Sequence, residues 1–131
     1  MIVLLYALVA LIVVFLIYYY FFMPGDPQVI LLKPKEARKK LRSGEIRSVV
    51  DVRKASSYQA GHYKDAVSFP LDTINPQTIN AKITADRIYS PTLIYCNSGK
   101  QAEKAAEMIA EEGIEFVYYV KVPYWELQKE D

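Results

Sequence analysis

The chain has 131 residues, 52% of them hydrophobic, and its 16 basic and 15 acidic side chains give a net charge of +1. This length accommodates about one domain, and the near-zero charge argues against nucleic acid or another polyanion as a partner. The single cysteine excludes an intramolecular disulfide, which fits a reducing compartment.

Residues 1–23 predict one transmembrane helix that anchors the protein in a lipid bilayer. They contain no charged residue, and about 20 apolar residues cross the hydrocarbon core. A cleaved signal peptide is the alternative, but this apolar run is longer than a usual signal core, no basic residue precedes it, and no small-residue cleavage site follows. We therefore expect a single-pass membrane protein with a linker at residues 24–27 and a domain at residues 28–131.

Basic residues follow the predicted span closely, and none precedes it. They are Lys33, Lys35, Arg38, Lys39, Lys40 and Arg42. Because basic residues beside a span favour the cytoplasmic side, we expect the C-terminal domain to face the cytoplasm. The same side chains also fit the solvated face of a helix.

Strands and helices alternate along the predicted domain. Short apolar runs predict strands at residues 29–32, 46–53, 66–71, 92–96 and 116–120. Helical patterns occupy residues 33–44, 76–83 and 99–113, and in the last of these alanines and Ile109 recur at steps of three and four. This alternation predicts an α/β fold with a parallel sheet.

Cys96 stands between a predicted strand and the clearest helix, in "LIYCNSGKQAEKAAEMI". Ligands of parallel sheets bind at the carboxyl ends of strands, and free amides in the turn Asn97–Gln101 would stabilise a thiolate. Lys100 adds a nearby cation, and Gly99 permits a positive φ or a close approach. The alternative is a small hydrophobe that ends a strand, and spacing alone leaves this choice open.

Two stretches together resemble the rhodanese homology domain. The first, "VVDVRKASSYQAGHYKDAVSFP" at residues 49–70, is similar through Asp51, Val52, Arg53, Tyr58, Gly61, His62, Ala66 and Pro70. The second, "LIYCNSGKQAEKAAEMIAEEGIEFVYYV" at residues 93–120, matches the strand, Cys-x-x-Gly loop, alanine-rich helix and following strand. Trp125 also falls where the family commonly has a tryptophan.

The resemblance implies a mainly parallel sheet of about five strands flanked by helices, preceded here by the transmembrane helix. Its implied active loop comprises Cys96, Asn97, Ser98, Gly99, Lys100 and Gln101. Cys96 would take sulfur from a small donor such as thiosulfate, become a persulfide, and pass the sulfur to cyanide or to a thiol, which a protein acceptor could carry. This chemistry needs no cofactor and no metal.

Some positions depart from the family pattern. Asn97 and Gln101 stand where many active members carry arginine, so Lys100 is the only charged side chain of the loop. Lys121 and Val122 replace a glycine pair that often precedes the tryptophan. Related phosphatase loops are one residue longer and end in arginine, so the sequence argues against phosphatase activity.

Other polar and aromatic residues are assigned supporting roles. His62, the only histidine, is expected to be a scaffold residue in a turn. Asp51 and Arg53 are expected to support the pocket through an internal ion pair, and Tyr118, Tyr119 and Trp125 to form core and rim. The predicted function is sulfur transfer through Cys96; the alternative is a noncatalytic rhodanese fold that binds a protein partner at the membrane.

Overall fold

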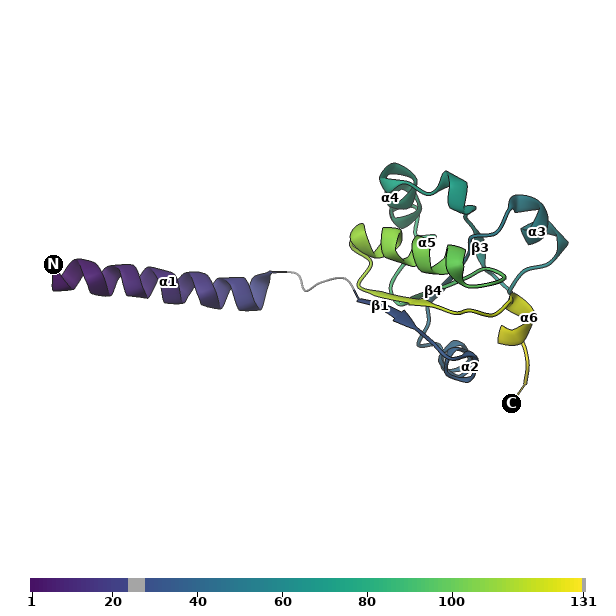
Figure 1. The fold of residues 1–131 in the computed structure, drawn as a ribbon, viewed down its shortest axis with the longest axis horizontal. Coiled ribbons are helices and arrows are strands. Elements are labelled where there is room, and N and C mark those ends of the chain that lie inside the picture. The colour runs from purple at the N-terminus through teal and green to yellow at the C-terminus, as the bar shows by residue number, and fades with distance from the viewer. Residues whose placement is uncertain (24–27, 131) are drawn as a thin grey trace.

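The computed structural model describes residues 1–23 and 28–130 (Figure 1). The predicted linker at residues 24–27 lies outside this description. Helix α1 (Ile2–Phe22) has no buried residue, and it is long and apolar enough, by length and composition, to cross a membrane. The anchoring role of residues 1–23 therefore stays a prediction.

A five-stranded parallel sheet forms the centre of the domain (Figure 1). Its strands are β1 (Gln28–Leu31), β2 (Ser48–Asp51), β3 (Val67–Ser68), β4 (Thr92–Tyr95) and β5 (Phe116–Tyr119). They lie in the order β1-β5-β4-β2-β3, and each neighbouring pair is parallel. The predicted α/β class and sheet are thereby confirmed, and β4 is the central strand.

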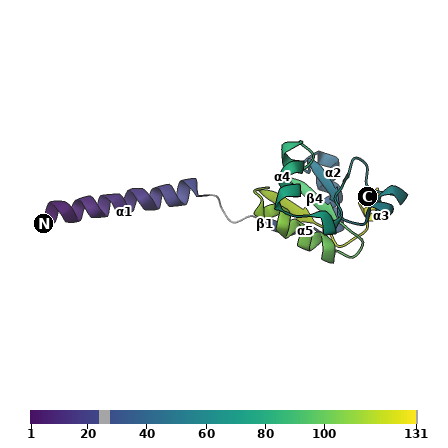
Figure 2. The same cartoon turned by 90° about the horizontal axis from the view of Figure 1, so that it is seen from above.

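Helices cover both faces of the sheet (Figures 1 and 2). They are α2 (Pro34–Ser43), α3 (Ala55–Ala60), α4 (Pro76–Thr84), α5 (Lys100–Glu111) and α6 (Tyr124–Leu127), with a 3₁₀ turn at Leu71–Thr73. The three helices expected from the sequence are present. The short helices α3 and α6 were not expected, because segments of six and four residues show too little periodicity.

Local signals explain where the longer helices begin and end. Proline occupies the first position of α2, where its missing N–H costs no hydrogen bond. Gly44 ends α2 with a φ of +80°, in the left-handed region that favours glycine. The Asn75 side chain accepts a hydrogen bond from the amide of Thr78, and the Thr78 hydroxyl accepts one from the amide of Asn75, so α4 starts with a capping box.

Two predicted strands are shorter in the structure. The strand predicted at 46–53 is confined to β2, and the one predicted at 66–71 to the two residues of β3. The chain still follows β2 after β3, because Phe69 N donates to Asp51 O at 2.8 Å and Leu71 N to Val52 O at 3.1 Å. Pro70 has no N–H to donate, and the chain then turns into the 3₁₀ segment.

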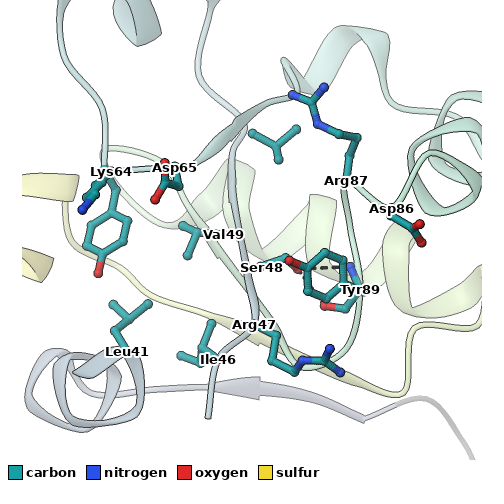
Figure 3. A pocket seen from close by; sticks show the side chains of 12 residues that line it. Leu41, Ile46, Arg47, Ser48, Val49, Lys64, Asp65, Asp86, Arg87 and Tyr89 are labelled. Carbon is teal, nitrogen blue, oxygen red and sulfur yellow. Dashed lines mark hydrogen bonds between the residues drawn. The ribbon is translucent and has the colours of Figure 1, made fainter. Parts of the chain in front are cut away.

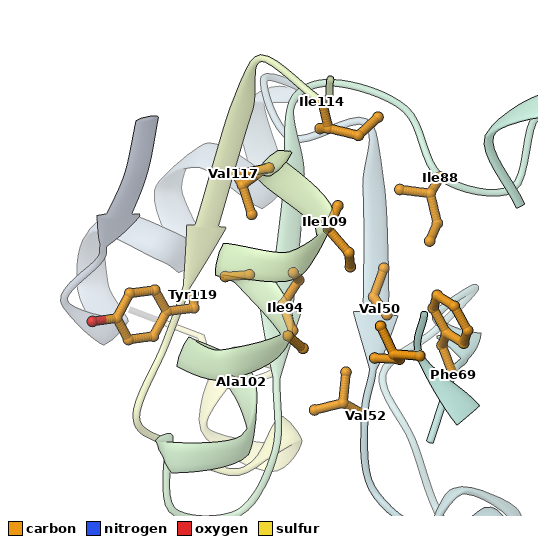
Figure 4. Close-up of a cluster of buried hydrophobic side chains, with 14 of the residues drawn as sticks. Val50, Val52, Phe69, Ile88, Ile94, Ala102, Ile109, Ile114, Val117 and Tyr119 are labelled. Atoms are coloured by element: carbon orange, nitrogen blue, oxygen red, sulfur yellow. The ribbon is translucent and has the colours of Figure 1, made fainter. Parts of the chain in front are cut away.

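Alternation along the strands divides the core into two clusters. One cluster, partly drawn in Figure 4, packs β2, β4 and β5 against α5 and includes Val50, Ile94, Cys96, Ala106 and Ile109. The other lies on the α2 and α6 side and includes Leu32, Ala37, Leu93, Tyr95 and Leu127. The buried hydrophobic residues of the described chain run from Leu32 to Leu127. A fragment that starts after α1 therefore keeps the whole core.

Candidate active site

Cys96 directly follows the central strand, on the face that α5 covers. Its side chain belongs to the cluster with Val50, Val52 and Ile94, and the residue is only 1% exposed. Its neighbour Tyr95 belongs to the cluster on the opposite face. The cysteine thus stands at the carboxyl end of a parallel strand, as predicted, but with little exposed surface.

One loop amide is directed at the sulfur. Gly99 N donates a hydrogen bond to Cys96 Sγ at 3.0 Å. Gly99 is the N-cap of α5 and has a φ of +92°, which favours glycine. An N–H group at this distance stabilises negative charge on sulfur, and the N-terminus of α5 adds partial positive charge.

The loop is tighter than the sequence indicated. Helix α5 begins at Lys100, so Lys100 and Gln101 form its first turn rather than the end of a five-residue turn. Asn97, Ser98, Lys100 and Gln101 are exposed, whereas Gly99 is buried. Of the six predicted loop residues, the four polar ones after Cys96 are therefore exposed, while the Cys96 sulfur and Gly99 are covered.

Gly99 is packed tightly against the segment that follows β5. A Cβ at this position would lie 2.5 Å from Cγ and 2.9 Å from Cα of Lys121. Real Cβ atoms do not approach other carbons so closely, so glycine permits this contact. Lys121 stands where the family often has a glycine, and no local sequence pattern indicated its contact with the loop.

The Asp51 carboxylate lies at the end of β2 and is completely buried. Arg53 Nη2 donates to Asp51 Oδ2 at 2.7 Å, and Arg53 Nε donates to Oδ1 at 3.0 Å. The Tyr95 hydroxyl donates to the same Oδ2 at 2.7 Å. The expected ion pair is therefore present, with a tyrosine from the central strand as a third member.

This network connects several segments at one end of the sheet. Arg53 Nη2 also donates to the carbonyl of Gly61 at 2.6 Å, and its guanidinium lies 5.2 Å from the ring centre of Tyr124. The hydrogen bond to Asp51 raises the pKa of Arg53. Burial, followed by the hydrogen bond to Asp51, raises the pKa of Tyr95. Tyr95 and Cys96 belong to the clusters on opposite faces of the sheet, so this network lies across the sheet from the Cys96 side chain.

The only histidine takes part in a separate local arrangement. His62 Nδ1 lies 2.8 Å from the carbonyl oxygen of Tyr58, and the two rings stack with centroids 3.8 Å apart. Because a carbonyl only accepts, Nδ1 is the donor. This arrangement fits the scaffold role expected for His62. Tyr118 and Tyr119 are buried, and Trp125 is 52% exposed.

A pocket of about 550 Å³ lies at the opposite ends of the strands (Figure 3). Its lining is mostly polar and comes from segments that precede or begin β2, β3 and β4: Leu41, Ile46, Arg47, Ser48, Val49, Tyr63, Lys64, Asp65, Val67, Asp86, Arg87 and Tyr89. None of the predicted site residues lines it. We therefore place the candidate active site at the Cys96 loop and not in this pocket.

Fold and loop together define a class of protein: an α/β domain with a cysteine at the end of its central parallel strand and a helix N-terminus directed at the sulfur. The chain belongs to the rhodanese-like domain family, whose family model matches residues 33–124.

Curated relatives and solved structures agree with this family. The tRNA uridine(34) hydroxylase of Photorhabdus laumondii is 32% identical over 73 residues, which are 55% of this chain and 21% of that protein. The chain thus spans about a fifth of the curated relatives that it matches. The human single-domain sulfurtransferase TSTD1 superimposes with a TM-score of 0.56 at 21% identity, over 82% of this chain and 100% of that one. A rhodanese-like domain from Anabaena superimposes with a TM-score of 0.58 at 18% identity, over 80% of this chain and 74% of that one.

Proposed function

We propose that this chain is a membrane-anchored sulfurtransferase that carries a sulfane sulfur on Cys96. The main support is the Gly99 amide, which donates to Cys96 Sγ at 3.0 Å at the end of the central strand. This amide favours the thiolate that attacks a donor and the persulfide that results. Membership of the rhodanese-like family supports the same chemistry. The match to the hydroxylases covers only about a fifth of those proteins, so it does not support hydroxylation by this chain.

The reaction consists of two displacements at sulfur. In the first, the Cys96 thiolate attacks the outer sulfur of thiosulfate; a sulfur–sulfur bond forms, the bond to the sulfonate group breaks, and sulfite leaves with the electron pair. In the second, cyanide or a thiolate attacks the outer sulfur of the persulfide, and Cys96 leaves as a thiolate. A persulfide donor would release a thiolate in place of sulfite. Lys100 would assist an anionic donor at the loop.

Residues 1–23 would hold this domain at a lipid bilayer. Helix α1 has the length and composition of a membrane span, and the basic residues lie after it, which favours a cytoplasmic domain. In sealed vesicles whose cytoplasmic face is outward, an external protease is expected to remove the domain. Protection of the domain until detergent is added would contradict this orientation.

A noncatalytic binding module is the second candidate. The observation that favours it is the 1% exposure of Cys96. A donor must reach the sulfur, so catalysis requires a movement of the loop or its rim that a binding module would not need.

One experiment separates the two candidates. The fragment 24–131 is incubated with thiosulfate or with a small-molecule persulfide, and its intact mass and its cyanide-dependent release of thiocyanate are measured. We expect the wild type to gain one sulfur atom that cyanide removes, and Cys96→Ser to gain none. A folded wild type that stays unmodified with both donors would reject the transferase and support the binding module.

A further inference from the structure

Lys121 is held against the Cys96 loop by the backbone. Val120 N donates to the carbonyl of Ile94 at 3.2 Å, which ties the chain after β5 to the central strand. Lys121 follows directly, and its Cα, Cβ and Cγ all approach the space that a Cβ on Gly99 would occupy, at 2.5–2.9 Å. The first half of the Lys121 side chain thus lies across the residue whose amide bonds to the sulfur.

The same contacts limit how far the Lys121 charge can be from the sulfur. The path from Cys96 Sγ through the Gly99 amide to Lys121 Cα uses the 3.0 Å hydrogen bond and the 2.9 Å contact, so the sulfur and that Cα are at most about 9 Å apart. A lysine ammonium lies up to roughly 6 Å from its Cα, so the Lys121 side chain is long enough to bring its charge near an anion at the sulfur. Lys121 is exposed, so its ammonium is open to solvent and to an incoming reagent.

A second cation follows Gly99 directly in the chain. Lys100 is the first residue of α5 and is exposed. The acidic residue of this first turn is Glu103, which interacts with the Tyr119 phenol. Two lysines and one glutamate leave a net positive charge on the residues next to Gly99 and in the first turn of α5.

We infer that Lys121, together with Lys100, forms a cationic rim that makes Cys96 react preferentially with anionic reagents, the class to which thiosulfate belongs. Lys121 is a specificity-determining residue in this scheme, whereas Cys96 performs the chemistry. The inference rests on the proposed function for its substrate class. Its test uses alkylation, which requires no sulfur transfer, so the two proposals can fail independently.

Alkylation of the only cysteine by two matched reagents measures the rim charge. Iodoacetate carries a negative charge and iodoacetamide is neutral, and both react with the thiolate. The ratio of their rates on fragment 24–131 therefore cancels changes in thiolate fraction and in loop opening. We expect Lys121→Gln to lower the ratio about twofold to fivefold, the effect of one exposed charge. Glutamine keeps the Cβ and Cγ that pack on Gly99, so the substitution removes charge and preserves the contact.

Two further variants complete the test. Lys121→Arg should retain the wild-type ratio, because it keeps the positive charge. Lys64→Gln removes an exposed charge at the opposite ends of the strands and should leave the ratio unchanged (Figure 3). Added salt should lower the wild-type ratio toward that of Lys121→Gln. An unchanged ratio in Lys121→Gln, an equal fall in Lys64→Gln, or a folded wild type that neither reagent labels would overturn the inference.

Discussion

Gly99→Ala tests whether the contact between the loop and Lys121 shapes the site. The added Cβ would lie 2.9 Å from the Cα of Lys121, a backbone atom that cannot move alone. The positive φ of +92° adds about 1–2 kcal/mol of backbone strain, and the overlap adds about 1–3 kcal/mol, as overpacking does in other cores. We expect a total loss of roughly 2–5 kcal/mol in the free energy of unfolding.

Two other glycines separate strain from overlap. Gly44 and Gly113 have φ values of +80° and +100°, and a Cβ at either would meet no atom within 4 Å. Gly44→Ala and Gly113→Ala should therefore lose only the strain contribution of about 1–2 kcal/mol. The difference between Gly99→Ala and these controls isolates the contact with Lys121.

Urea unfolding of the fragment 24–131, followed by circular dichroism, measures each loss from the midpoint and slope. Iodoacetamide labelling provides an independent measurement, because a displaced Gly99 moves its amide away from Cys96 Sγ. We expect Gly99→Ala to change the labelling rate and the two controls to leave it near the wild-type value. Equal stability losses in all three variants, with equal labelling rates, would refute the reasoning.

Three further predictions concern the rest of the domain. Asp51→Asn should lower the free energy of unfolding by about 3–5 kcal/mol, because it leaves the buried Arg53 charge unpaired. Glu45→Gln, in an exposed ion pair, should lower it by under about 1 kcal/mol. Equal losses for the two variants in urea unfolding would contradict this prediction. Because the pKa of Tyr95 is raised in the folded state, the unfolded state loses the phenol proton at a lower pH than the folded state does. The free energy of unfolding should therefore fall above about pH 10, and Tyr95→Phe should weaken that fall. The same dependence on alkaline pH in the variant and the wild type would count against this prediction. Asn75→Ala removes the cap of α4 and should lower stability by about 1 kcal/mol, and an unchanged urea midpoint would show that the cap contributes nothing.

Patterns that are local in sequence predicted most of the fold. The alternation of apolar runs with helical periods predicted the parallel sheet, and the alanine stripe predicted α5, which the structure confirms. Strand boundaries were less well predicted, since β2 is confined to Ser48–Asp51 and β3 is only two residues long. Short elements depend more on tertiary contacts than on their own sequence, because a few residues show too little of either period.

Some components of the candidate site could be identified from the sequence, and others could not. Cys96, the loop and the pair of Asp51 and Arg53 were all identified from sequence, since each lies within a short motif. Tyr95 and Lys121 were not assigned to the site, because their partners are distant in the chain. Tyr95 contacts Asp51 across 44 residues, and Lys121 reaches Gly99 from the end of a neighbouring strand.

The sequence by itself determined the five strands and three longer helices, their order, and the position of the one cysteine between a strand and a helix. Only the tertiary structure decided that the Cys96 sulfur is covered, that one amide is directed at it, and that Lys121 lies across the loop. The physical reason is that strand and helix periods are properties of neighbouring residues. Contacts at the site depend instead on the register in which β2, β4 and β5 pair, and this register is set when the sheet packs.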